Sequence, residues 1–387
     1  MSYARSRLWL GISGVGFIVM LSVSCLAMKT PYVLLPSGVT WSWSDLVALV
    51  AGFTGLVAIM LPFDVVGGYL LPSRAGRSEG SVKSFLLNWG QGVTVQAGFF
   101  VTSGLLILAL GRCYGLLGAS LAVGVLCLVL VTFQFRLGVL AGTLQQRKEL
   151  SEADRVRLRA AARLTSACGW QRREIVLVSH SDMGFMGGIV GLPRREKIVV
   201  PEGMLSRLST DELAATIARR LEAIDTGSRT RGLAVAVGWV LLGFNLSAMS
   251  PGAGVTSVAE LTMTCLGFTL WSFLGLLTLP TLSRQAAFAI DNQVVARGVP
   301  SASLTRSLCI IDQQQDDEQE RPRIIETIFH PVPSVGRRHD RGKASTPIAW
   351  HVARTALFLS WACMGLLVRA VHCNVGRPEL WVMYPTD

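Results

Sequence analysis

Long uncharged stretches fill the first third of the chain and return twice later. A helix needs about 20 predominantly apolar residues to cross the roughly 30 Å hydrocarbon core of a bilayer. Several stretches reach or approach that length, and the pattern predicts a polytopic membrane protein. These stretches are residues 8–28, 46–63, 86–111, 113–135, 232–249 and 261–282.

Two apolar segments have more than one interpretation. In residues 348–371, only 14 uncharged residues separate Arg354 from Arg369, so the segment spans a membrane only if both arginines reach opposite interfaces. Its alternative is a buried or interfacial helix. Residues 8–28 have a signal sequence as their alternative, because basic residues precede the stretch and small residues precede Cys25.

A second pattern, with shorter periods, lies between and after the later apolar stretches. Ser151 can cap a helix through residue 168, and two β-branched runs flank a glycine-rich turn. Ser209 and Glu212 form a capping box ahead of a helix with an apolar stripe. Another helix runs from Ser283 toward residue 297, and the acidic, glutamine-rich residues 312–320 read as a mobile loop. The predicted strands are residues 174–179 and 197–200, and the turn is residues 184–191.

These patterns predict a mainly α membrane protein: a bundle of six to seven spans with a cytoplasmic α+β domain that a transmembrane hairpin splits. The expected parts are a four-helix membrane region, two halves of one soluble domain around the hairpin, and a C-terminal apolar helix with a tail. Their expected ranges are residues 1–135, 136–231, 232–282, 283–346 and 347–387.

Composition supports the membrane assignment and adds an orientation. The chain is 51% apolar and 16% charged, where soluble domains carry about a quarter charged residues. With the N-terminus inside, 32 of the 36 lysines and arginines fall on the inner side, which the positive-inside rule favours. Arg112, Arg369 and Arg377 are among those left outside. We therefore expect the soluble domain to be cytoplasmic.

The net charge of +11 follows from that rule and from attraction to anionic headgroups. Nucleic acid is not an expected partner, because no recognition motif and no aromatic residues are interleaved with the basic ones. The eight cysteines are scattered singly without a CxxC pair, and read as small packing residues.

The order of strand, glycine-rich turn, strand, capped helix, membrane hairpin and second helix resembles metallopeptidase family 48. That family includes the CAAX prenyl protease and the bacterial membrane protease HtpX. The resemblance covers about residues 150–340 and rests on three segments. These are Ile198-Val-Val-Pro-Glu-Gly-Met-Leu205, Leu208-Ser-Thr-Asp-Glu-Leu213, and Ser283-Arg284 with Asp291.

The resemblance implies a zincin-like fold and a catalytic zinc, but the zinc positions are replaced. In the register of Glu212, the His-Glu-x-x-His motif falls on Arg219, Arg220 and Ala223, and the third ligand on Ala287. Two histidines at i and i+4, a third ligand and an open position are what the chemistry needs. A guanidinium about 5 Å from Zn²⁺ is repelled by roughly 6 to 7 kcal/mol at an effective dielectric of 20. We therefore expect no cofactor.

Other residues of the family pattern are retained. Glu212, Ser283, Arg284 and Asp291 match it, and His330 lies in a late His-Pro segment that we interpret as a marker of the fold. No two of the five histidines are spaced i, i+3 or i, i+4.

Two acids lie nearest the replaced positions. We expect Glu222 and Asp291 to form salt bridges with Arg219, Arg220 or Arg284. The hypothesis is that Arg219 or Arg220 takes the zinc's place and makes an ionic crosslink.

The sequence predicts three alternative functions. The first is a pseudoprotease that binds or scaffolds membrane-protein partners or an extended polypeptide, through strand addition at residues 197–200. The second is an active metalloendopeptidase with nonstandard ligands. The third is an unrelated basic membrane scaffold. A bacterial inner membrane is the expected location.

Overall fold

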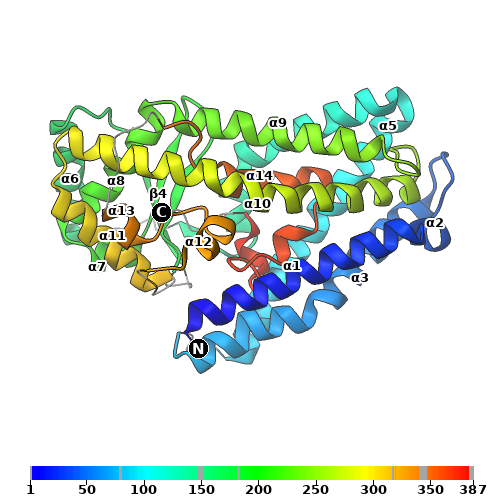
Figure 1. Ribbon diagram of the computed structural model, residues 1–387, viewed down its shortest axis with the longest axis horizontal. Coiled ribbons are helices and arrows are strands. Elements are labelled where there is room, and N and C mark those ends of the chain that lie inside the picture. Colours follow the sequence, from blue (N-terminus) through cyan, green and yellow to red (C-terminus); the bar gives the residue numbers. More distant parts are fainter. Residues whose placement is uncertain are drawn as a thin grey trace. The chain divides into compact units, whose positions relative to one another are not determined.

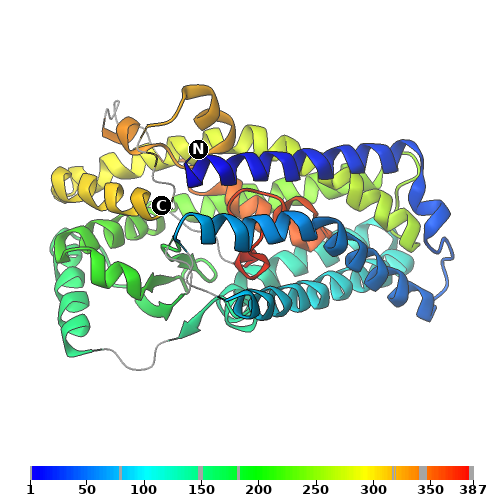
Figure 2. The same ribbon diagram turned by 90° about the horizontal axis from the view of Figure 1, so that it is seen from below.

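The structure is a computed structural model that describes residues 2–77, 81–146, 151–180, 184–315, 318, 320–339 and 347–382. The described chain forms two compact units. Unit 1 comprises residues 2–131, 236–275 and 356–382, and unit 2 comprises residues 132–235 and 276–355. Figures 1 and 2 show the elements from two sides.

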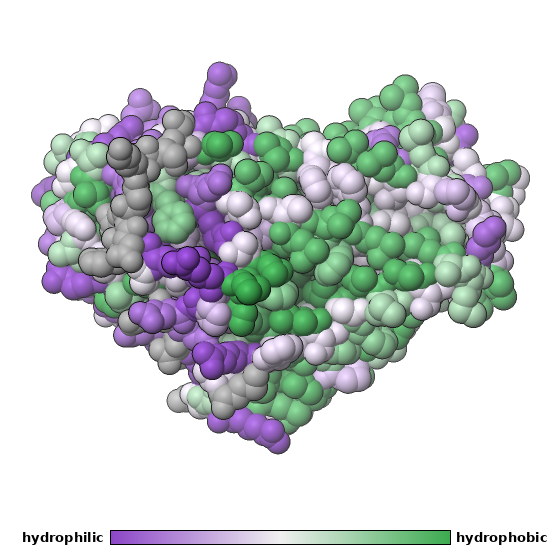
Figure 3. Space-filling view, in the orientation of Figure 1, coloured by the Kyte–Doolittle hydropathy of each residue, from purple (hydrophilic) through white to green (hydrophobic). Residues whose placement is uncertain are grey.

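Helices make up unit 1. They are α1 (Tyr3–Ala27), α2 (Thr30–Leu34), α3 (Trp43–Val65), the π-helical η1 (Val66–Leu70), α4 (Leu71–Arg74) and most of α5 (Val82–Leu140). Both units contain parts of α9 (Ser228–Ala248) and α10 (Val258–Ala296). In the described chain, five helical stretches are long and apolar enough to cross a membrane: α1, α3 to α4, α5, α9 and α10. Figure 3 shows apolar side chains spread over the outer surface of helices of this unit.

Helix α5 contains the predicted spans 86–111 and 113–135 in two arms. Gly115 breaks the helix with φ 62° and ψ −151°. A Cβ on Gly118 would collide with the carbonyl oxygen of Leu110, so the chain doubles back at this point. The two arms therefore form a hairpin that turns at the glycine, just after Arg112.

The weaker seventh segment is not a spanning helix. It begins with α14 (Val352–Leu359), whose 8 residues cover only about 12 Å at 1.5 Å per residue. Three short 3₁₀ turns follow: η2 (Ser360–Cys363), η3 (Leu367–Arg369) and η4 (Pro378–Trp381). Of the alternative, a buried or interfacial helix, the structure shows burial of most residues but an α-helix only in α14.

Unit 2 is an α+β domain. Its helices are α6 (Glu152–Ala167), α7 (Glu202–Arg207), α8 (Thr210–Asp225), α11 (Ser301–Gln315), α12 (Arg323–Phe329) and α13 (Val335–His339). Its strands are β1 (Gln145–Gln146), β2 (Glu174–Ser179), β3 (Gly188–Val190) and β4 (Lys197–Pro201). Apolar side chains of α8, α10 and the sheet form a common core around Ile198, Leu213, Ile217 and Ile290.

The sheet corrects one prediction about the edge strand. Its order is β1-β2-β4-β3, with β2 parallel and β3 antiparallel to β4. Strand β3 lies inside the glycine-rich turn that the sequence left without a strand. Gly187, at φ 75°, lets the chain approach β4, because a Cβ there would meet the carbonyl oxygen of Val199. Residues 197–199 are thus paired on both sides, so β4 is not the edge strand that the sequence suggested.

The acidic segment 312–320 is also partly structured. Helix α11 continues through Gln315, and the buried Asp312 accepts an ion pair from Arg321 at 3.3 Å. Residues 316, 317 and 319 lie outside the described residues. The prediction of a loop was therefore wrong for residues 312–315, which are helical. Asp312 can be buried there because the Arg321 guanidinium offsets the free-energy cost of removing its carboxylate from water.

Helix α8 begins with the capping box that the sequence predicts. The Ser209 hydroxyl accepts from the Glu212 backbone N–H at 3.4 Å, and a Glu212 carboxylate oxygen accepts from the Ser209 N–H at 2.8 Å. Two of the helix's unpaired amide donors are satisfied in this way.

Ser209→Ala removes one half of this box, and we expect the free energy of unfolding of unit 2 to fall by about 1 kcal/mol. Ser206→Ala is the matched control, because Ser206 is exposed and its hydroxyl only donates to the carbonyl of Gly203. Amide exchange along α8 in the purified chain measures both. Equal exchange in the two variants would contradict the capping role.

Candidate functional site

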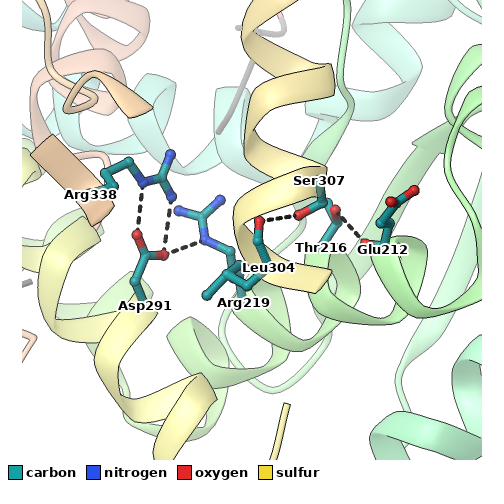
Figure 4. A network of polar contacts seen from close by, with 7 residues as sticks. All are labelled: Glu212, Thr216, Arg219, Asp291, Leu304, Ser307 and Arg338. Carbon is teal, nitrogen blue, oxygen red and sulfur yellow. Dashed lines mark hydrogen bonds and ion pairs between the residues drawn. The ribbon is translucent and has the colours of Figure 1, made fainter. Parts of the chain in front are cut away.

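Three elements of unit 2 meet at the carboxylate of Asp291. Helix α8 brings Arg219, α10 brings Asp291, and α13 brings Arg338 (Figure 4). Arg219 donates from Nε to Oδ1 at 2.7 Å. Arg338 donates from Nε to Oδ2 at 2.7 Å and from Nη2 to Oδ1 at 3.1 Å. The predicted ion pair between Arg219 and Asp291 is therefore present, and Arg338 joins it.

All three side chains are removed from solvent. The side chains of Arg219, Asp291 and Arg338 are 1%, 0% and 2% exposed. Burial alone would raise the pKa of Asp291, but Arg338 and Arg219 outweigh it and hold the pKa below the usual value. The stabilisation from this ionised carboxylate is present above the usual Asp pKa and is lost as the pH falls through the lowered value.

Arg220 turns the other way and binds backbone. Its Nη1 donates to the carbonyl of Val199 at 3.0 Å, and its Nη2 donates to the carbonyl of Met186. The guanidinium thus joins α8 to strand β4 and to the segment before β3. These two carbonyl acceptors satisfy part of the donor capacity of the guanidinium.

The donors at these positions do not fit a zinc ion. Ala223 and Ala287 are buried at 0% and 1% exposure and carry no ligand atom. Both oxygens of Asp291 already accept from guanidiniums. Among the described residues, no group of three or more His, Cys, Asp or Glu side chains is placed to hold a metal. The arrangement therefore supports a buried ionic crosslink.

Glu222 differs from the prediction. It pairs with Arg297 at 3.1 Å and accepts from the indole Nε1 of Trp170 at 2.8 Å. The Arg297 guanidinium also lies 5.4 Å from the centroid of the Trp170 ring. Arg297, which follows directly after α10, therefore takes the place of the arginines that the sequence suggested as partners of Glu222.

The retained family residues have structural contacts. The Ser283 hydroxyl accepts from the backbone N–H of Ala353 at 3.1 Å, and Arg284 donates to Thr281 Oγ1 at 3.3 Å. Glu212 closes the capping box and pairs with Arg306 at 3.4 Å. His330 is buried and follows directly after α12.

Sequence reasoning missed two members of this region. Arg338, eight residues after His330, is a partner of Asp291 that the sequence did not suggest. Glu326 is buried and accepts from Ser334 at 2.7 Å and from Arg337 at 3.4 Å. The sequence signal for both was the pair of adjacent arginines, 337 and 338, because a guanidinium that packs into the fold needs an acid nearby.

Comparisons with known proteins show which solved structure has a similar fold. No protein-family model matches the chain, and no curated protein matches it in sequence. Among solved structures, it is similar to S. mikatae Ste24p, with a TM-score of 0.64 and 13% identity over 84% of this chain and 80% of that chain. Ste24p is a CAAX prenyl protease of metallopeptidase family 48. The chain is therefore a multi-helix protein with a Ste24p-like fold.

The cluster makes a graded prediction about stability. Asp291→Asn leaves two buried guanidiniums without their shared charge, and we expect a loss of about 3 to 5 kcal/mol in the free energy of unfolding. Arg219→Met keeps the Asp291 pair with Arg338, so the loss is smaller. Denaturant unfolding of the purified chain gives both values.

A surface pair provides the control for this series. Glu174 and Lys197 pair at 2.8 Å with side chains 58% and 48% exposed, so Glu174→Gln costs less than about 1 kcal/mol. A loss for Asp291→Asn no larger than that for Glu174→Gln would reject the crosslink.

Proposed function

We propose that the chain is a pseudoprotease, a membrane protein with a peptidase fold that binds or scaffolds other membrane proteins without cutting them. The observation that carries this proposal is the Asp291 carboxylate, held between Arg219 and Arg338 next to positions that lack metal donors. The proposal also draws on the resemblance to family 48 and on the Ste24p-like fold. A multi-pass location with unit 2 in the cytoplasm of a bacterium belongs to the same proposal.

The ionic cluster supports this function by holding the fold together. Asp291 lies 72 residues from Arg219 and 47 residues from Arg338 along the chain. A zinc ion bound by helices equivalent to α8 and α10 would join the same elements. In this chain the Arg219–Asp291 ion pair joins α8 to α10, and the Arg338–Asp291 pair adds α13, so this architecture does not depend on a metal.

Arg220, which is not part of the Asp291 cluster, opposes hydrolysis. A peptidase of this type needs a general base to take a proton from the attacking water. Arg220 stands at that position, and a guanidinium does not deprotonate near neutral pH. Its donors are also engaged by the carbonyls of Val199 and Met186.

Partner recognition needs a different surface from the one the sequence suggested. Strand β4 is an inner strand, and the three residues of β3 are largely buried. The proposed partners are therefore membrane proteins that meet the helices of unit 1. These helices expose large apolar side chains, including Met20 at 65%, Leu117 at 82% and Leu121 at 64%. Such side chains suit lipid and neighbouring helices alike.

Two other functions remain as outcomes of the test. An active metalloendopeptidase would need ligands other than those of the family. An unrelated basic scaffold is the weaker competitor, because the fold extends over most of both this chain and Ste24p.

Metal analysis and a peptide-cleavage assay on the full-length chain test the proposal together. We expect less than about one tenth of a zinc per chain and no cleavage that a chelator abolishes, since three ligands are missing. The matched control carries Arg219→His, Arg220→Glu, Ala223→His and Ala287→Glu. It restores the family donors, and we expect it to take up zinc.

Stoichiometric zinc in the unmodified chain, with chelator-sensitive cleavage, would establish the active enzyme instead. Zinc uptake by the four-residue variant alone would support replacement of a former metal site.

A further inference from the structure

The C-terminal part of unit 1 is buried although it has little regular secondary structure. After α14, residues 360–382 contain only the 3₁₀ turns η2, η3 and η4, and most of them are buried. Figures 1 and 2 both show this red segment among α1, α3 and α10. Irregular backbone at membrane depth is tolerated only inside protein or beside water, because its polar groups lack helical partners.

Side chains of the surrounding helices supply those partners. Arg7 of α1 donates from Nε and Nη2 to the carbonyl of His372 at 3.2 and 2.7 Å. Gln96 of α5 donates to the carbonyl of Pro378 at 2.6 Å. Contacts of this kind bind backbone and do not depend on the side chain of the bound residue.

Arg369 is bound through its side chain. The Asp64 carboxylate of α3 pairs with Arg369, which also donates to Gln96 Oε1 at 2.8 Å. Asp64 further accepts from Trp89 Nε1 at 2.9 Å and from the Gly376 N–H at 3.2 Å. The side chains of Asp64 and Arg369 are 2% and 1% exposed. Burying an ion pair this deeply in a membrane bundle costs free energy. Such pairs are therefore found where surrounding groups hydrogen-bond to them or where they have a function.

Glycines of the surrounding helices admit the segment. A Cβ on Gly11 of α1 would lie 2.6 Å from the His372 nitrogen, and one on Gly92 of α5 would lie 2.6 Å from the Glu379 nitrogen. A Cβ on Gly68 of η1 would overlap the Gly376 carbonyl oxygen. Three helices thus carry glycine where the segment's backbone passes.

We propose that unit 1 contains a polypeptide-binding groove, and that residues 367–379 are its tethered internal ligand. The groove accepts an irregular, arginine-containing membrane segment: Arg7 and Gln96 hold its backbone, and Asp64 selects the arginine. While Arg369 occupies the groove, segments of other membrane proteins are excluded from it. This site is separate from the Asp291 cluster and does not depend on the chain being a pseudoprotease.

The first test asks whether the groove holds the segment. The full-length chain in lipid nanodiscs is compared by amide exchange with Gly11→Ala, Gly68→Ala and Gly92→Ala. Controls on the same or the adjoining helix are Gly16→Ala, Gly55→Ala and Gly90→Ala, where an added Cβ meets nothing within 4 Å. We expect residues 367–379 to exchange at least about tenfold faster in the first set only, with α8 unchanged.

The second test asks whether the segment behaves as a ligand. Arg369→Gln releases the tethered segment but leaves Asp64 in place. A fluorescent peptide of residues 360–382 that retains Arg369 and Arg377 is then added in trans, and anisotropy measures its binding. We expect saturable binding to Arg369→Gln, at least tenfold weaker binding to the unmodified chain, and at least tenfold weaker binding of the peptide with glutamine at 369.

Each other outcome overturns part or all of the proposal. Equal exchange in the two glycine sets would remove the groove. Faster exchange without peptide binding would make the segment an ordinary part of the fold. Equal binding of the arginine and glutamine peptides would remove the role of Asp64. Metal content and cleavage do not enter either test, so the groove and the pseudoprotease can fail independently.

Discussion

The arrangement of unit 2 depends on one buried carboxylate, Asp291. A carboxylate removed from water is strongly destabilising unless charged donors replace its hydration. Arg219 and Arg338 supply three short contacts to it, from a helix before the membrane hairpin and a helix after it. Any conformation that separates α8, α10 and α13 leaves a buried charge unpaired. The cluster therefore specifies how these elements meet, whatever it adds to net stability.

Unit 1 has a similar arrangement with a different consequence. Asp64 and Arg369 are 305 residues apart in the chain, and both are buried. The pair brings the C-terminal segment back among helices formed near the N-terminus. In unit 2 the ion pairs join helices, whereas in unit 1 the pair seats backbone that has no regular structure. Glycines at the points of contact allow that seating, since a side chain at the same positions would displace the segment.

The Ste24p-like fold does not by itself specify a function, so the residues of the site have to be considered separately. A fold is retained when its packing and buried polar contacts are retained, and it does not by itself specify chemistry. The proposal rests on the prediction that Arg219, Arg220, Ala223 and Ala287 stand where members of family 48 carry their metal ligands and general base. The contacts of Arg219 and Arg220 indicate that both arginines are integrated into the core. This integration is what the proposed binding or scaffolding function draws on.

The sequence by itself determined the membrane-spanning stretches, the helices α6 and α8, and strands β2 and β4, because each depends on local periodicity and capping. It also predicted that Arg219 or Arg220 would pair with Asp291 or Glu222, and the pair of Arg219 with Asp291 is the one of these that the structure shows. Only the tertiary structure decided that β3 covers β4, that Arg338 is the second partner, and that Glu222 pairs with Arg297. It also decided that Asp64 binds Arg369. These contacts join residues far apart in the chain, and one sequence holds no local signal for which charges will meet.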